Sequence, residues 1–295
     1  MSAPTYDLGK LHGGMRLEAR KQASTDQPIA RVPIPSQLVL PLTQHAGDDA
    51  QPVVSIGERV LRGQLIADCG NRLGAPVHAP SSGKVVAIEP WPVTRRHGGT
   101  AICIVIETDG EDRSIEPVES IPDFLQLDPQ SVLTMILQGG IVGLGGAVFP
   151  TAQKLMQAVS GKLEYLILNG VECEPYISCD DVLMRERAQE VLRGAQILLH
   201  ALGIDSAFIA VESDKPEAIR QLVDVLNLLD DPRLVLKQVP TIYPSGGEDQ
   251  LVQLVLGLGR AVVDVGLNAS NQGDDLFQLF LAEFENRLHV FPVLL

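Results

Sequence analysis

The segment Glu164-Tyr-Leu-Ile-Leu-Asn-Gly-Val-Glu-Cys-Glu-Pro-Tyr176 gives the strongest indication of the fold class. Its apolar half predicts a strand over Glu164–Leu168, and Asp180-Asp181 then predicts the start of a long helix that ends near Gly203. The alternation continues as strand, helix, strand and helix over Ala207–Val211, Pro216–Leu229, Leu234–Val239 and Asp249–Leu256. Strands that alternate with helices of this length indicate a parallel α/β sheet.

The region before this sheet has two different patterns. Residues 50–108 hold short apolar runs separated by turn residues, which predicts an all-β barrel or sandwich. Its glycine, proline and valine spacing resembles the barrel-sandwich hybrid of biotinyl and lipoyl domains. Asp128-Pro129 then predicts a helix start, because Asp is a good N-cap and Pro suits the first helical position. That helix should stop at Gly139-Gly140, and a short helix is expected over Thr151–Val159.

Composition excludes several classes of protein. The chain has 295 residues, of which 45% are hydrophobic, and this is enough apolar material for about two domains. Its net charge of −14 argues against a nucleic-acid partner, because phosphate binding needs clustered Lys and Arg. Four Cys exclude a disulfide framework. The sequence contains neither a signal-peptide pattern nor a membrane-spanning apolar run, so we expect a soluble intracellular protein.

Gly139–Lys154 is the richest candidate site. Five glycines fall within eight positions ahead of the expected short helix. Backbone N–H groups at a helix start favour phosphate, and Lys154 adds a cation there. The stretch is not a Walker loop, since Gly161-Lys162 is followed by Leu163, and it is a poor dinucleotide fingerprint, since a helix precedes it. On composition alone, a glycine-rich connector remains the alternative.

Two further junctions carry polar residues. Asn169–Tyr176 follows a strand, and Tyr243–Glu248 lies between a strand and a helix. Ligands of open α/β sheets bind at the carboxyl ends of strands. Glu172 and Glu174 are two residues apart, so an extended backbone would place them on one side, where they can bind hydroxyl groups. A solvated acidic turn is the alternative, and the charged runs Arg185–Arg187 and Lys215–Glu217 are expected to be solvated helix faces.

Taken together, these motifs closely resemble the RnfC family, which supplies one component of the Rnf ion-translocating electron-transport complex. The resemblance covers about residues 8–260 and rests on Gly143-Leu-Gly-Gly-Ala-Val-Phe-Pro-Thr151, Asn169–Tyr176 and Tyr243–Glu248. More distantly, the motifs are similar to the flavin-binding subunit of respiratory complex I. The implied domains are an N-terminal extension (1–36), a barrel-sandwich hybrid domain (37–110), an FMN/NADH-binding α/β domain (111–260) and a divergent tail (261–295).

The resemblance implies FMN and NADH as cofactors. Hydride passes between NADH and the flavin, and single electrons then pass to iron–sulfur clusters, so that no side chain need act as acid or base. By motif position, the residues implied in cofactor binding are Gly143, Gly145, Gly146, Lys154, Asn169, Glu172, Glu174, Tyr243, Gly246, Gly247 and Glu248. No catalytic side chain and no metal ligand are implied in this chain.

The chain departs from the family in three places. Val148 stands where the family has a glycine, so either its φ is negative or the loop is strained. Val171 stands where the complex I relative has an acid, so the resemblance to that relative supports FMN binding more strongly than NADH binding. After Gly259-Arg260 the rest of the flavin domain and the ferredoxin-like region with its 4Fe-4S clusters are not found. A frameshifted or truncated copy is the simplest explanation, and we expect an α/β domain that is incomplete at its C-terminus.

Four cysteines without a Cys-x-x-Cys pair predict that this chain holds no iron–sulfur cluster. The expected partners are the other Rnf subunits at the cytoplasmic face of the inner membrane, NADH and ferredoxin. This chain by itself is expected to lack full NADH-driven turnover. The alternative function is a non-catalytic docking or structural module of the same complex, without cofactor because of Val148 and the missing C-terminal part.

Overall fold

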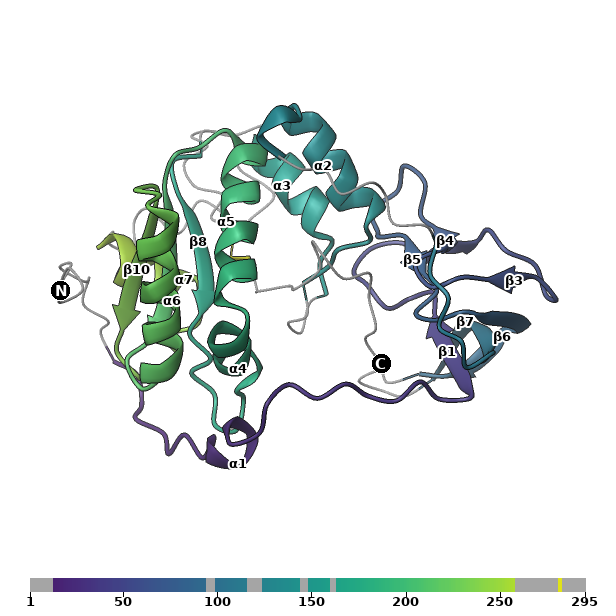
Figure 1. Ribbon diagram of the computed structural model, residues 1–295, viewed down its shortest axis with the longest axis horizontal. Coiled ribbons are helices and arrows are strands. Elements are labelled where there is room, and N and C mark those ends of the chain that lie inside the picture. Colours follow the sequence, from purple (N-terminus) through teal and green to yellow (C-terminus); the bar gives the residue numbers. More distant parts are fainter. Residues whose placement is uncertain are drawn as a thin grey trace. The chain divides into compact units, whose positions relative to one another are not determined.

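The computed structural model describes residues 13–93, 99–115, 124–143, 148–159, 163–257 and 281–282. The chain divides into two compact units, one containing Met1–Ala30 and Leu155–Glu285, the other Arg31–Lys154 and Asn286–Leu295. Figure 1 shows the elements of both units. Residues 13–30 of the predicted extension (1–36) are therefore grouped with the α/β unit, and residues 31–36 with the other unit. Most of the predicted tail (261–295) lies outside the described residues.

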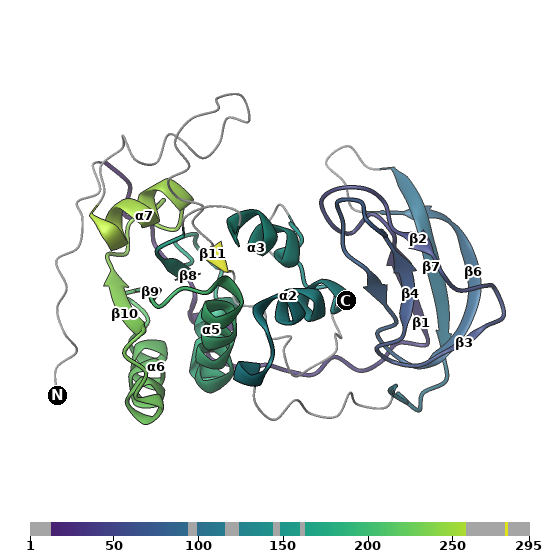
Figure 2. The same ribbon diagram turned by 90° about the horizontal axis from the view of Figure 1, so that it is seen from above.

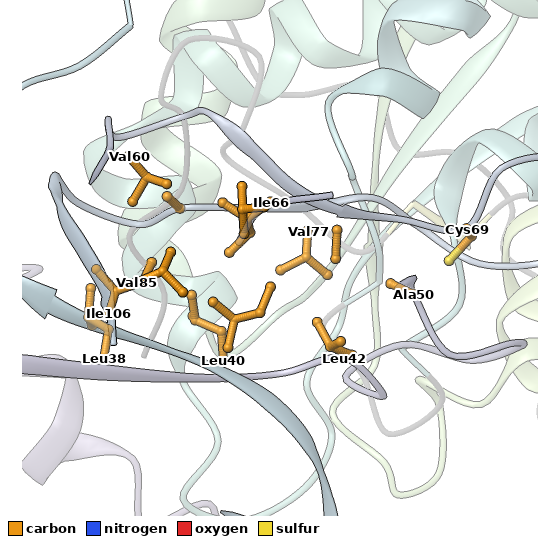
Figure 3. Close-up of a cluster of buried hydrophobic side chains, with 14 residues drawn as sticks. Leu38, Leu40, Leu42, Ala50, Val60, Ile66, Cys69, Val77, Val85 and Ile106 are labelled. Atoms are coloured by element: carbon orange, nitrogen blue, oxygen red, sulfur yellow. The ribbon is translucent and has the colours of Figure 1, made fainter. Parts of the chain in front are cut away.

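The unit that contains Arg31–Lys154 holds two antiparallel sheets. One sheet has the order β1-β7-β6-β3 and the other β2-β4-β5. The strands are β1 (Gln37–Pro41), β2 (Gln51–Pro52), β3 (Arg59–Val60), β4 (Leu65–Asp68), β5 (Val77–His78), β6 (Gly83–Pro92) and β7 (Thr100–Thr108). Both sheets contribute buried side chains to one apolar core, for example Leu40 from β1 and Ile66 from β4 (Figure 3). This arrangement confirms the predicted barrel-sandwich architecture.

Helix α2 (Pro129–Gln138) belongs to the same unit and follows the short 3-10 helix η1 (Phe124–Gln126). It begins as its sequence predicts, because the Asp128 side chain accepts a hydrogen bond of 3.0 Å from the Ser131 N–H. Its apolar side buries Val132, Leu133 and Ile136. The helix ends at Gly139, and α3 (Thr151–Val159) follows the glycine-rich stretch.

The α/β unit is built on a parallel sheet with the strand order β10-β9-β8-β11. Its strands are β8 (Leu166–Gly170), β9 (Ala207–Glu212), β10 (Leu234–Val239) and β11 (Leu281–Ala282). Helices α5 (Ala188–Leu202) and α6 (Pro216–Leu229) lie on one face of the sheet and α7 (Glu248–Leu256) on the other (Figure 2). This three-layer arrangement confirms the predicted parallel α/β fold.

The helix predicted from Asp180-Asp181 to Gly203 is in fact two helices, α4 (Cys179–Glu186) and α5. The break lies at Arg187, whose backbone leaves the helical region with φ −133° and ψ 29°. Helix α5 ends as predicted, because Gly203 takes the left-handed conformation that glycine adopts without steric cost. Within the described part of the chain, no helix has both the length and the apolar character needed to cross a membrane.

Candidate functional site

The carboxyl ends of two parallel strands, β8 and β10, carry the predicted polar loops of the α/β unit. Strands β8, β9 and β10 follow one another toward one edge of the sheet, and β11 pairs with the opposite side of β8, so the strand order switches direction at β8. In open α/β sheets, ligands bind outside the carboxyl ends of the strands at such a switch point. The loop after β8 contains Asn169–Tyr176, so the topology places this predicted motif at the position where a ligand is expected.

Asn169 connects two of the predicted motifs. Its side-chain oxygen accepts a hydrogen bond of 3.2 Å from the Val171 N–H, which shapes the loop after β8. Its side-chain nitrogen donates to the Gly246 carbonyl at 3.0 Å, which attaches this loop to the loop after β10. A Cβ at Gly246 would lie 3.3 Å from the Cys173 sulfur, so the two loops approach closely. Motifs that are far apart in the sequence therefore meet at one edge of the sheet.

Glu172 caps helix α4. Its two carboxylate oxygens accept hydrogen bonds from the backbone N–H groups of Asp180 (2.7 Å) and Asp181 (3.0 Å), and the Cys179 thiol donates to the first at 3.3 Å. Helix N-termini favour negative charge, so this carboxylate stabilises α4.

The backbone at Glu172 has a φ of 52°, so the extended conformation assumed for Glu172 and Glu174 is wrong. Glu172 is only 8% exposed, whereas Glu174 is exposed. The two carboxylates therefore differ in surroundings, and the predicted paired grip on hydroxyl groups loses its geometric basis.

Lys215 is a buried charge that the sequence misassigned to a solvated helix face. Its ammonium donates to the Val171 carbonyl at 2.6 Å and to the Glu212 carboxylate at 3.0 Å. The other Glu212 oxygen accepts from the Ser245 hydroxyl at 3.1 Å. Lys215, Glu212 and Ser245 therefore join the carboxyl ends of β8, β9 and β10. Their sequence signal is weak, because Glu212 and Lys215 lie at the end of β9 whereas their partners Val171 and Ser245 come from the loops after β8 and β10.

Burial and charge shift the protonation of this cluster. Burial raises the pKa of the Glu212 carboxyl above its ordinary value. For Lys215, desolvation acts to lower the pKa, but the carboxylates of Glu212 and Asp214 outweigh it, and the pKa lies above the ordinary value. We therefore treat Lys215 as an ammonium that holds the strand ends together. The prediction of a solvated face is also partly wrong for Arg185–Arg187, because Arg185 pairs with the buried Asp181.

Tyr243 and the residues after it complete the edge. The Tyr243 backbone forms a two-way bridge with Met15, with both N–H···O distances at 2.8 Å. Gly247 immediately precedes α7, and Glu248 is its first residue, so this loop is a strand-to-helix junction as predicted. Among the described residues, the buried Thr241 hydroxyl oxygen has no hydrogen-bond partner. A polar group left unpaired in this way is a candidate ligand contact.

The glycine-rich stretch belongs to the other unit and is described separately. The Gly143 N–H donates to the Phe149 carbonyl at 2.9 Å, and the predicted site residues Gly145 and Gly146 lie outside the described residues. The sequence predicted either a negative φ at Val148 or a strained loop. Val148 has a φ of 44°, so the backbone is strained. Lys154 lies in the first turn of α3.

Models of two protein domains match this chain. A model of the RnfC barrel sandwich hybrid domain matches residues 9–111, and a model of the Nuo51 FMN-binding domain matches residues 136–273. The chain belongs to the RnfC family. Its similarity to the flavin-domain model runs past residue 260, where the sequence alone suggested that the resemblance ends.

Two curated relatives of this RnfC-type chain are named as subunits of an ion-translocating oxidoreductase complex. The Vibrio cholerae protein is 42% identical over 265 residues, and the Pseudomonas aeruginosa protein is 44% identical over 267 residues. Each alignment covers 88% of this chain but 34% of the relative, so the chain spans about a third of their length. The solved structure of an NAD+-reducing NiFe-hydrogenase in the air-oxidized state aligns at 27% identity over 43% of this chain and 23% of that chain, with a TM-score of 0.39.

Proposed function

We propose that this chain binds FMN at the carboxyl edge of β8, β9 and β10, as the flavin-bearing part of an Rnf electron-transfer subunit. The observation that carries the proposal is the Asn169–Gly246 hydrogen bond, which joins two motif loops inside the segment matched by the FMN-binding domain model. The unpaired Thr241 hydroxyl supplies a polar group at the same edge. The N–H of the buried Glu172 also lacks an acceptor among the described residues, so the edge offers donors that fit a flavin.

Each motif has a proposed role in holding the cofactor. Gly143, Gly145, Gly146 and Lys154 supply backbone N–H groups and a cation for phosphate. Asn169 fixes the loops after β8 and β10, and Glu172 holds that first loop against α4. The residues proposed to line the remaining edge are Glu174, Tyr243, Gly246, Gly247 and Glu248. When bound, FMN would supply hydride acceptance and single-electron release, and these residues would hold and orient it.

The wider function is also a proposal. NADH is the proposed hydride donor, and the other Rnf subunits and ferredoxin are the proposed partners, at the cytoplasmic face of the membrane. Iron–sulfur clusters need closely spaced thiolates, and the four cysteines at 69, 103, 173 and 179 are free and widely spaced. We therefore propose that electrons leave the flavin for clusters that other segments or subunits hold.

One observation favours a second candidate function. Val148 combines a β-branched side chain with a left-handed backbone, in the loop proposed to approach the cofactor. A chain whose loop cannot accept FMN would act as a docking module of the same complex.

Fluorescence titration of FMN with the purified chain separates the two candidates. FMN binding that weakens about tenfold or more in Asn169→Ala, and not in the control Asn227→Ala on the exposed side of α6, supports the flavin site. A chain that does not change FMN fluorescence at any concentration is the docking module.

A further inference from the structure

The segment Gly13–Ala30 lies along the loops of the proposed flavin edge and is held there by backbone and side-chain contacts. At one end, Met15 forms the backbone bridge to Tyr243. Further along, the Ala19 carbonyl accepts from the Tyr176 N–H at 2.9 Å. At the other end, the Ile29 N–H donates to the Glu186 carboxylate at 2.9 Å. The segment therefore follows the edge from the loop after β10 to the end of α4.

Lys21 is the buried side chain of this segment. It immediately precedes the short helix α1 (Gln22–Thr25), which itself buries no residue. Lys21 is only 9% exposed, and its ammonium donates to the Glu172 carbonyl. Burial and the nearby charge of Lys215 lower its pKa below the ordinary value. A charge held against such a cost in an otherwise exposed segment indicates a specific role for it.

Lys21 and Lys215 bind consecutive carbonyls. Lys215 donates to the Val171 carbonyl and Lys21 to the Glu172 carbonyl, so both sides of the left-handed residue Glu172 are fixed. Within the described residues, the Glu172 N–H has no hydrogen-bond acceptor, and the Cys173 N–H has only the weak acceptor of its own thiol. An ammonium bound to a peptide carbonyl polarises that peptide, and its N–H becomes a stronger donor.

We propose that Lys21 and Lys215 are positioning residues that hold the Val171–Cys173 peptides so that the N–H groups of Glu172 and Cys173 donate to an electron-rich edge of bound FMN. The inference rests on the proposed function and goes beyond it, because it makes the N-terminal segment part of the flavin site. Reduced flavin carries more negative charge than oxidised flavin, so donors held at its edge stabilise the reduced form more. Loss of the Lys21 ammonium should therefore weaken FMN binding and lower the flavin midpoint potential.

The test compares Lys21→Met with Lys21→Arg, which keeps the charge, and with Arg16→Met, which removes an exposed charge from the same segment. The FMN dissociation constant is measured by fluorescence, and the midpoint potential by reductive titration against a reference dye. We expect Lys21→Met to weaken FMN binding by about tenfold to a hundredfold and to lower the potential. Lys21→Arg should recover most of both quantities, and Arg16→Met should match the wild type.

Two failures have different meanings. A wild-type chain that does not bind FMN overturns the proposed function. A wild-type chain that binds FMN, together with a Lys21→Met variant of unchanged affinity and potential, overturns the positioning role alone. Circular dichroism reports whether Lys21→Met folds. If it does not, Lys21→Gln carries the test, because its amide still donates to the Glu172 carbonyl without the charge. An unchanged potential in Lys21→Gln contradicts the inference.

Discussion

Replacing Lys215 by Met tests the buried link between the three strand ends. The side chains of Lys215 and Glu212 are each 1% exposed, and the Lys215 ammonium also occupies the Val171 carbonyl. Met has a similar shape but leaves Glu212 as an unpaired buried charge and Val171 with an unpaired carbonyl. Breaking a buried ion pair in this way costs about 3–5 kcal/mol, a large share of the roughly 5–15 kcal/mol by which folded proteins are stable.

Urea unfolding followed by far-UV circular dichroism measures this cost, since most helices belong to the α/β unit. The matched control is Arg220→Met, which breaks a pair of the same i,i+3 spacing with Glu217 but on the surface, where the side chains are 62% and 47% exposed. Exposed pairs contribute about 0–1 kcal/mol. The double variant Lys215→Met with Glu212→Met should regain only the part of the loss that comes from the unpaired Glu212 charge, because the Val171 carbonyl and the Ser245 hydroxyl still lack their partners. If Lys215→Met is no less stable than Arg220→Met, the buried Lys215–Glu212 pair does not stabilise the fold.

Three further predictions concern single positions. Val148→Gly should slightly raise the thermal stability of the barrel unit and tighten FMN binding. Glycine relieves about 1–2 kcal/mol of strain from the left-handed backbone, which exceeds its entropic cost of roughly 0.5–1 kcal/mol. If neither stability nor FMN affinity rises, Val148 is not strained. Desolvation, Asp180 and Glu172 raise the pKa of Cys179 to about 12, so iodoacetamide at pH 8 should label it more than about tenfold more slowly than an ordinary thiol, as mass spectrometry can check. The hydrogen bond from Arg233 lowers the pKa of Asp231 below 3.8, so its stabilising contribution is present above that pH and lost as the pH falls through the lowered value. Acid titration should then destabilise the wild type more steeply than Asp231→Asn, and equal slopes would exclude this contribution.

Features set by neighbouring residues could be predicted from the sequence. The alternation of strands and helices indicated the parallel sheet, and the caps at Asp128 and Gly203 are formed as their residue types predict. The motif comparison also anticipated the family and the meeting of Asn169 with Gly246. These features depend on periodicity, on local hydrogen bonding and on the rule that parallel strands end at one edge.

Features set by distant contacts could not be predicted. Lys215-Pro-Glu has the pattern of a solvated helix start. The Lys215 ammonium is nevertheless buried and donates to the Val171 carbonyl, 44 residues away in the sequence. Lys21 lies in a polar segment without periodicity, and its ammonium is buried where it donates to the Glu172 carbonyl. The left-handed backbone at Glu172 follows from capping α4 and could not be read from a two-residue spacing. Local pattern does not encode such pairings.

Hydrogen–deuterium exchange of the purified chain with and without FMN locates the flavin site on the fold. If FMN binds at the carboxyl edge of the parallel sheet, the peptides that contain Glu172-Cys173 and Tyr243–Gly247 should exchange more slowly with FMN. The exposed side of α6 should be unchanged. Protection by FMN that leaves both of these loops unaffected would place the flavin elsewhere and contradict the account.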